Sequence, residues 1–209
     1  MVKLDQPILL ATGNRHKLAE VRPVLEPAGV RLEGLDSLDR SIPEPVEDQP
    51  TFAGNAELKA RYYARQTGRV CLADDSGLVV DALHGEPGVY SARYAGVSGD
   101  RAEADAANNA KLLRALRDVP EDQRTARFVC VMALCSPDKT LAIVQGEVAG
   151  RILLAPRGVS GFGYDPVFYL PDLGYTAAQL TQEQKNAISH RGRAARELLT
   201  ALRRLGSAV

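Results

Sequence analysis

The chain has 209 residues, of which 45% are hydrophobic and 25% are charged, the proportions of a globular protein that buries a core. Basic and acidic residues number 26 each, so the formal net charge is zero, which argues against general nucleic-acid or membrane-surface binding because both need a field of one sign. No apolar run approaches the roughly 20 residues of a membrane span, and the first ten residues have no cleavage-site pattern, so we predict a cytoplasmic protein without a signal peptide.

The first third of the chain alternates between strand and helix patterns. The stretch 7–11 (PILLA) predicts a strand that ends in a tight turn at Gly13, and a helix follows from about Arg15. Pro23 should kink or shorten that helix. A second strand over 30–35 then leads into an acidic, proline-rich loop, SIPEPVEDQP.

A long helix and a strand pair come next. Thr51 is the expected N-cap of a helix that Gly68 stops. The following stretch CLADDSGLVV predicts a strand over 70–73, a turn over 74–77 and a strand over 78–82. Further patterns predict a helix over 101–117, a hairpin of β-rich runs at 127–135 and 140–152, and a final helix capped by Ser189.

The order of these elements indicates the fold class. Strands and helices alternate early, the middle holds a β-hairpin, and neither a repeat nor a flexible linker separates parts of the chain. This pattern favours an α/β protein with a mixed sheet over a purely parallel one.

The three cysteines have no spacing typical of a metal site. Cys71, Cys130 and Cys135 each lie in an apolar, strand-like run, and their number is odd. We therefore predict buried free thiols.

The segment ATGNRHK can bind an anion. A strand that ends in glycine and opens a helix gathers free backbone N–H groups at the positive end of the helix dipole, which suits a phosphate. Lys17 lies one turn into this helix and can add a charge. The alternative is a plain strand-to-helix turn with Lys17 on a solvated face.

Asp74 and Asp75 are adjacent acids between two apolar runs. Neighbouring side chains of an extended strand point to opposite faces, so the two acids face one ligand only if the turn begins between them. One acid then binds Mg²⁺ or polarises a water while the other braces the loop; alternatively, both bond backbone N–H groups. Glu47, in the acidic loop, is a possible second oxygen ligand for Mg²⁺, or else a solvated loop charge.

Two segments of the C-terminal third add ligand-binding features. In SGFGYDP the glycines at 161 and 163 allow close backbone approach, and Phe162 and Tyr164 can stack on a planar ring, while Asp165 suits a turn. Lys185, His190 and Arg191 bring positive donors to a helix start, although such clusters are usually solvated. Together with the turn and the acids, these are the parts of a nucleoside triphosphate site.

The sequence resembles the inosine triphosphate pyrophosphatase family. The resemblance lies in LLATGNRHKLAEV, TFAGNAELKA, LADDSGLVVDALHGEPGVYSARYAG, GFGYDPVF and KNAISHRGRA, and it covers nearly the whole chain in order. It implies an elongated mixed β-sheet with flanking helices that form two lobes around a central cleft, as one domain over 1–209. A homodimer is also implied.

The resemblance further implies a Mg²⁺-dependent hydrolysis of non-standard purine nucleoside triphosphates, dITP, ITP and XTP, to the monophosphate and pyrophosphate. Asp75 would be the general base and, with Glu47, a metal ligand, and Ser76 would touch the substrate. The remaining substrate-binding residues that it implies are Thr12, Gly13, Asn14, Arg15, His16 and Lys17 at the phosphates, and Phe162, Gly163, Tyr164, Asp165, Lys185, His190 and Arg191 around the nucleotide.

One position departs from the family pattern. The family often has F-x-E-N-A where this chain has FAGNA, so Gly54 replaces an acid and any contact of that acid needs another provider.

Two alternative functions remain open at this point. One is a pyrophosphatase for modified pyrimidine or 7-methylguanine nucleotides, and the other is a non-catalytic nucleotide-binding module.

Overall fold

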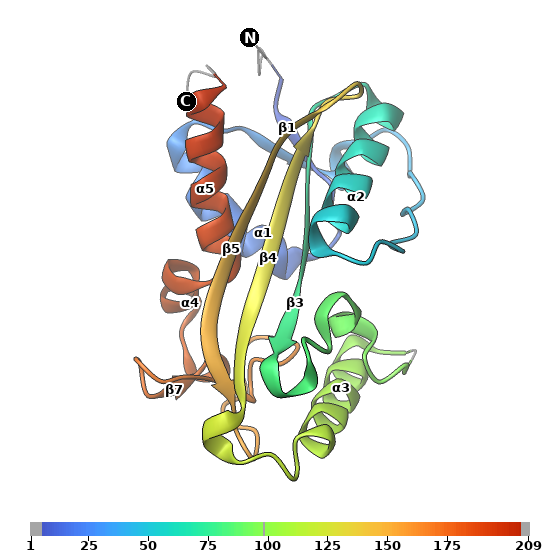
Figure 1. The fold of residues 1–209 in the computed structure, drawn as a ribbon. Coiled ribbons are helices and arrows are strands. Elements are labelled where there is room, and N and C mark those ends of the chain that lie inside the picture. The colour runs from blue at the N-terminus through green and yellow to red at the C-terminus, as the bar shows by residue number, and fades with distance from the viewer. Residues whose placement is uncertain (1–5, 98, 206–209) are drawn as a thin grey trace. The chain divides into compact units, whose positions relative to one another are not determined.

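The computed structural model describes residues 6–97 and 99–205, apart from the side chains of Arg15 and His16. Its helices and strands are shown in Figure 1. The helices are α1 (Arg15–Leu25), α2 (Phe52–Thr67), α3 (Arg101–Ala115), α4 (Gln182–Ile188) and α5 (His190–Arg204). The strands are β1 (Ile8–Leu10), β2 (Leu32–Gly34), β3 (Cys71–Val80), β4 (Thr125–Cys135), β5 (Thr140–Ile152), β6 (Phe168–Leu170) and β7 (Tyr175–Thr176).

The strands form one mixed sheet. Within the described residues its order is β2-β1-β3-β4-β5-β6-β7. β1 pairs in parallel with β2 and with β3, whereas β6 pairs antiparallel with β5 and with β7. The prediction of an α/β protein with a mixed sheet is therefore confirmed.

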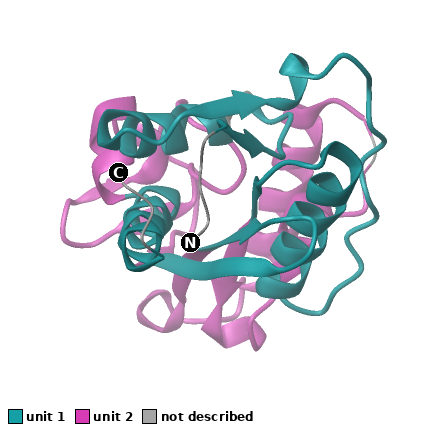
Figure 2. Cartoon of the chain, turned by 90° about the horizontal axis from the view of Figure 1, so that it is seen from above, with its two compact units in different colours: residues 1–75, 130–147, 189–209 teal, residues 76–129, 148–188 magenta. Residues whose placement is uncertain are grey.

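The chain divides into two compact units, coloured separately in Figure 2. Unit 1 comprises residues 1–75, 130–147 and 189–209, and unit 2 comprises residues 76–129 and 148–188. The strands β3, β4 and β5 contribute residues to both units. Each unit has its own buried apolar cluster, as expected for parts that fold around separate cores.

In unit 1, helices cover both faces of β3. Leu72 packs in a cluster with Val21 and Leu25 of α1 and Leu198 of α5. The neighbouring Cys71 lies on the other face, where its thiol contacts Thr67 of α2 at 3.8 Å. Because side chains alternate between the two faces of a strand, the adjacent acids Asp74 and Asp75 of β3 also meet different partners.

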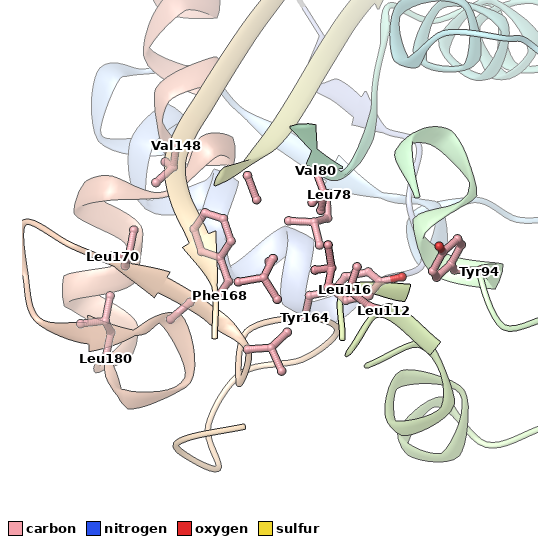
Figure 3. Close-up of a cluster of buried hydrophobic side chains, with 14 residues drawn as sticks. Leu78, Val80, Tyr94, Leu112, Leu116, Val148, Tyr164, Phe168, Leu170 and Leu180 are labelled. Atoms are coloured by element: carbon pink, nitrogen blue, oxygen red, sulfur yellow. The ribbon is translucent and has the colours of Figure 1, made fainter. Parts of the chain in front are cut away.

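In unit 2, an aromatic and aliphatic cluster joins α3 to the strands (Figure 3). The cluster contains Leu112 of α3 and Leu116, the C-cap of that helix. These two side chains pack with Leu78 and Val80 from the end of β3 and with Phe168 of β6. All five side chains are at most 1% exposed, so α3 is fixed along its C-terminal half.

The predicted helix ends agree with the structure. The Thr51 hydroxyl accepts a hydrogen bond from Gly54 N at 3.0 Å, and Gly68 ends α2 with φ +70°. The Ser189 hydroxyl accepts from Gly192 N at 3.0 Å and so caps α5. Pro23 lies in the last turn of α1, which ends at Leu25.

One element was predicted wrongly. The turn expected over 74–77 does not exist, because β3 runs without interruption from Cys71 to Val80. The turn was inferred from Ser76 and Gly77, which are residue types common in turns. The strand continues through both acids because each has its own partner on its own face, Lys17 for Asp74 and Asn55 for Asp75.

The three cysteines are free and buried, as predicted. Burial raises the pKa of the Cys71 thiol to about 11, and it also raises the pKa values of Cys130 and Cys135. Among residues 6–97 and 99–205, no helix combines the length and apolar character that crossing a bilayer requires.

Candidate active site

The parallel pairing of β1 and β3 brings two sequence motifs to the same edge of the sheet. Leu10 pairs with Leu72, and Ala11 N donates to Leu72 O at 2.8 Å. Thr12, just beyond the carboxyl end of β1, therefore lies beside Asp74, the fourth residue of β3. Ligand sites in open α/β sheets form just beyond the carboxyl ends of parallel strands such as β1.

The turn after β1 is organised around the start of α1. Asn14 N donates to the Thr12 hydroxyl at 3.1 Å, and Asn14 Oδ1 accepts from Lys17 N at 3.4 Å, as an N-cap residue does. The side chains of Arg15 and His16 lie outside the described residues. The turn thus places the positive end of the helix dipole beside the acids of β3.

Asp74 binds two cations that come from opposite ends of the chain. Its carboxylate lies 2.9 Å from Lys17 Nζ of α1 and 3.5 Å from Arg191 Nε of α5. Burial raises the pKa of Asp74, but Lys17 and Arg191 more than offset this effect, so the pKa lies below its usual value. Lys17 is consequently part of an ion-pair network rather than on a solvated face.

Arg191 has a second acidic partner. Its Nη1 lies 3.3 Å from Glu20 Oε1, and the side chains of Arg191 and Glu20 are 5% and 1% exposed. Ser189, two residues before Arg191, caps α5, and His190 between them is also buried. Two acids therefore compensate one buried guanidinium at the N-terminus of α5.

A glycine of β5 allows α5 to approach the sheet. A Cβ atom at Gly146 would lie 2.3 Å from both His190 O and Ala194 N. Only glycine fits such a backbone contact without moving the helix. Gly146 thereby fixes the position of His190 and Arg191.

Asp75 lies on the opposite face of β3 and meets α2. Asn55 Nδ2 donates to Asp75 Oδ2 at 3.0 Å, while Asn55 Oδ1 accepts from Gln49 N at 2.9 Å. One amide side chain thus joins Asp75 to the acidic loop that carries Glu47, two residues before Gln49. The two acids of β3 have different partners, as the strand geometry requires.

Lys59 is a cation of this site that the sequence analysis missed. Its Nζ forms an ion pair with Glu47 and a longer one, of 3.6 Å, with Glu44. Burial lowers the pKa of Lys59, but the acids, Glu47 foremost, raise it above its usual value. Lys59 therefore stays charged although its side chain is only 8% exposed.

Gly54 permits the acidic loop to pack against α2. A Cβ atom at this position would lie 2.8 Å from Gln49 Cβ and 3.2 Å from the Thr51 hydroxyl. The glycine that replaces the acid of the family pattern therefore has a structural reason, because a side chain here would push against the loop that carries Glu47.

The donor set around Asp75 fits a hard cation. In the described part of the chain, no cluster of three or more His, Cys, Asp or Glu side chains is arranged to hold a metal. Magnesium, however, is commonly bound by one or two carboxylates, while waters and substrate phosphates complete its shell. Asp75 and Glu47, whose segments Asn55 joins, would be the two carboxylates of such a site.

Unit 2 holds the glycine-aromatic loop. Gly161 and Gly163 have φ values of +83° and +62°, and Phe162 lies between them. Asp165 Oδ2 accepts from Phe162 N at 2.9 Å and from Lys185 Nζ at 2.6 Å. A Cβ atom on Gly161 would lie 2.1 Å from that same oxygen, so the loop closes tightly around the Asp165 carboxylate.

The two aromatic residues of this loop have different environments. Phe162 is half-buried, with Lys185 Nζ 4.7 Å from its ring centroid. Tyr164 is 4% exposed and packs in the apolar cluster of unit 2, and its hydroxyl donates to Ser91 O at 2.8 Å (Figure 3). Burial raises the pKa of Tyr164 above its usual value. Phe162 is the better candidate for stacking on a planar ligand.

The predicted site residues fall into two groups, one in each unit. Unit 1 contains Thr12, Gly13, Asn14, Lys17, Glu47, Asp75, His190 and Arg191, and unit 2 contains Ser76, Phe162, Gly163, Tyr164, Asp165 and Lys185. The sequence patterns did not identify Glu20, Asn55 and Lys59. Lys59 had a readable signal, since it falls on the buried stripe of α2 with Ala56 and Tyr63, where an unpaired lysine is rare.

The chain is similar to known proteins over most of its length. The model of the Ham1 family matches residues 8–201. A dITP/XTP pyrophosphatase of Nocardia farcinica is 53% identical over 93% of this chain and 94% of its own length. One from Lactobacillus acidophilus is 48% identical over 95% and 98%.

Solved structures are similar as well. A HAM1 protein from Coxiella burnetii superposes with a TM-score of 0.84 at 42% identity and covers 95% of this chain and 98% of its own. A nucleoside-triphosphatase, or dITP/XTP pyrophosphatase, from Mycobacterium abscessus gives a TM-score of 0.75 at 47% identity, with coverage of 93% and 99%.

Proposed function

The chain belongs to the Ham1 family, and from that premise we propose that it hydrolyses dITP, ITP and XTP to the nucleoside monophosphate and pyrophosphate. In this reaction water forms a bond to the α-phosphorus, and the bond from that phosphorus to the bridging α–β oxygen breaks. The bridging oxygen leaves with the pyrophosphate, and the water proton passes to a base.

The cations of unit 1 support the binding of a triphosphate. Lys17 lies in the first turn of α1, whose free N–H groups also attract phosphate oxygens, and Lys59 adds a second positive charge in the same unit. Both lysines are paired with acids, Asp74 and Glu47, and so keep their positions before a nucleotide binds. Bound Mg²⁺, held by Asp75 and Glu47, would neutralise further phosphate charge.

Asp75 is the proposed general base. Asn55 holds one of its carboxylate oxygens, which fixes the orientation of the group on the face of β3 that meets α2. From this position the carboxylate orients a water in line with the α–β bond and accepts its proton. Asp74 is unsuited to that role because it is already engaged with Lys17 and Arg191.

Arg191 is the proposed reader of the base. A guanidinium donates only, so it matches the O6 acceptor of hypoxanthine and xanthine and is mismatched with the 6-amino group of adenine. Glu20 and Asp74 hold two of its nitrogens and fix its plane. Phe162 is the proposed stacking surface for the purine ring.

The observation that carries this proposal is the placement of two acids with separate partners on one strand. Asp74 is bound to cations on one face of β3, and Asp75 is held beside the Glu47 loop on the other. Hydrolysis of dITP in ¹⁸O-labelled water tests it. The proposal expects the ¹⁸O label to appear in dIMP. The other product should be unlabelled pyrophosphate. Orthophosphate and dIDP as products would contradict it.

The homodimer and the cytoplasmic location stay predictions from the sequence. Sedimentation equilibrium measures the first, and a mass of one chain at micromolar concentration would contradict it.

A further inference from the structure

One face of α3 contacts the glycine-aromatic loop through three side chains. Arg101, Asp105 and Asn109 follow one another at intervals of four residues and so lie on the same face of the helix. The Arg101 guanidinium carbon is 5.8 Å from the centroid of the Phe162 ring. Asp105 Oδ2 accepts from Gly163 N at 2.7 Å, and Asn109 Nδ2 donates to Gly163 O at 2.8 Å.

The backbone of Gly163 depends on these two side chains. Its φ of +62° takes the chain out of any strand or helix, so its N–H and C=O have no ladder to join. Asp105 supplies an ionised acceptor, and its other oxygen is 3.1 Å from Arg101 Nε, which orients the carboxylate. Both polar groups of a single residue are thus held from the same helix.

Asn109 is placed for this contact at a cost. Its Nδ2 donates to Gly163 O and also, at 2.9 Å, to Asp105 O, which fixes the orientation of the amide. Its Oδ1 is buried and has no hydrogen-bond partner among the described residues. A buried unsatisfied oxygen is unfavourable, so an apolar residue would suit the position unless the two donated bonds matter.

The rest of the loop is anchored elsewhere. The Tyr164 ring packs against the core with Leu112 and Leu116, further along α3 (Figure 3), and Asp165 receives Phe162 N. Gly163 connects Phe162 to Tyr164, and its N–H and C=O are both bonded to α3.

We infer that Asp105 and Asn109 are positioning residues, which fix Gly163 and through it the Phe162 ring for stacking on the purine. The inference rests on the proposed function of the loop in base binding. Neither residue touches the reacting phosphates in this account, so both act on nucleotide affinity and base selectivity and leave the chemical step unchanged.

The test compares the full chain with the Asp105→Ala, Asn109→Leu and Asp105→Asn variants in kinetics with dITP and dATP. We expect the KM for dITP to rise about tenfold in the first two while kcat changes less than about threefold. Asp105→Asn retains an acceptor oxygen and should restore most of the affinity. The double variant should cost less than the product of the single effects, because both residues hold one peptide unit.

A control separates positioning from general stability. Leu113→Ala removes packing of the same helix against the core without touching these bonds, and it should lower the melting temperature while leaving KM unchanged. An equal rise of KM in Leu113→Ala, or unchanged KM in both Asp105→Ala and Asn109→Leu, would overturn the inference.

A readout that needs no activity keeps this test apart from that of the proposed function. Native-state hydrogen exchange of the Gly163 amide should be slow in the unmodified chain and at least about tenfold faster in Asp105→Ala. Unchanged protection of the Gly163 amide in Asp105→Ala would overturn the positioning role, even if the enzyme is active. If protection is lost in Asp105→Ala but the unmodified chain does not hydrolyse dITP, the positioning role stands and only the proposed function is refuted.

Discussion

The two units hold their site residues by different physical means. In unit 1, buried charges from α1, β3 and α5 compensate one another, as Lys17, Asp74, Arg191 and Glu20 illustrate. In unit 2, one loop is held mostly through its backbone, which bonds to Asp105, Asn109 and Asp165. Removing one charge from a compensated network leaves its partners unpaired, whereas removing one loop contact only loosens a shape.

This difference predicts that variants of the two β3 acids in unit 1 act on rate or stability, whereas variants of the loop contacts in unit 2 act on affinity. The largest expected effect is that of Asp75→Asn, which keeps the shape and the contact with Asn55 but removes the base. We expect kcat for dITP to fall by at least ~100-fold with KM nearly unchanged. Unchanged pyrophosphate release from dITP in this variant would show that Asp75 is not the base.

Asp74→Asn tests the neighbouring acid and should act on stability instead. Loss of the carboxylate leaves the partly buried Lys17 and the buried Arg191 less compensated, so the free energy of unfolding should fall by about 3 kcal/mol. Urea denaturation measures this. Asp118→Asn, at an exposed pair with Arg117, serves as the control and should change stability by less than about 1 kcal/mol. Equal effects of the two substitutions would remove the distinction between compensated and solvated charges.

Much of the fold could be read from the sequence, because caps and strand patterns are local. Thr51, Gly68 and Ser189 end their helices as expected. The prediction of a turn at Asp74–Gly77 was wrong, because the partners that stabilise the acids within a continuous strand are distant in the chain. Lys17, for example, is 57 residues from Asp74.

The candidate site was predictable only in part for the same reason. Glu20 and Arg191 are 171 residues apart, and no local pattern connects them. Asn55 and Lys59 looked like ordinary members of α2, although the buried stripe on which they lie was visible. Motifs resembling a known family identified the segments, whereas the pairing of charges needed the three-dimensional structure.

Arg191→Lys probes base selectivity in unit 1. Lysine keeps the charge that Glu20 and Asp74 compensate but loses the planar fork, so the preference for dITP over dATP should fall about tenfold, more than kcat for dITP falls. Steady-state kinetics on both nucleotides measures the ratio. A proportional loss on all bases would assign Arg191 a role in binding or stability only.

Gly54→Ala should have the smallest effect. The added Cβ would press on Gln49 and shift the acidic loop that carries Glu47, so the Mg²⁺ concentration for half-maximal activity should rise a few-fold, about three to five times. A magnesium titration of both proteins checks this. An unchanged titration curve would separate the packing at Gly54 from metal binding.

The central claim is that the chain removes non-standard purine nucleotides by cleavage at the α-phosphorus. The direct measurement is pyrophosphate release from dITP compared with dATP and dGTP, each with and without Mg²⁺. The account predicts rapid release from dITP that requires Mg²⁺ and little release from the two standard nucleotides. Equal rates on all three, or release from dITP that does not depend on Mg²⁺, would contradict it.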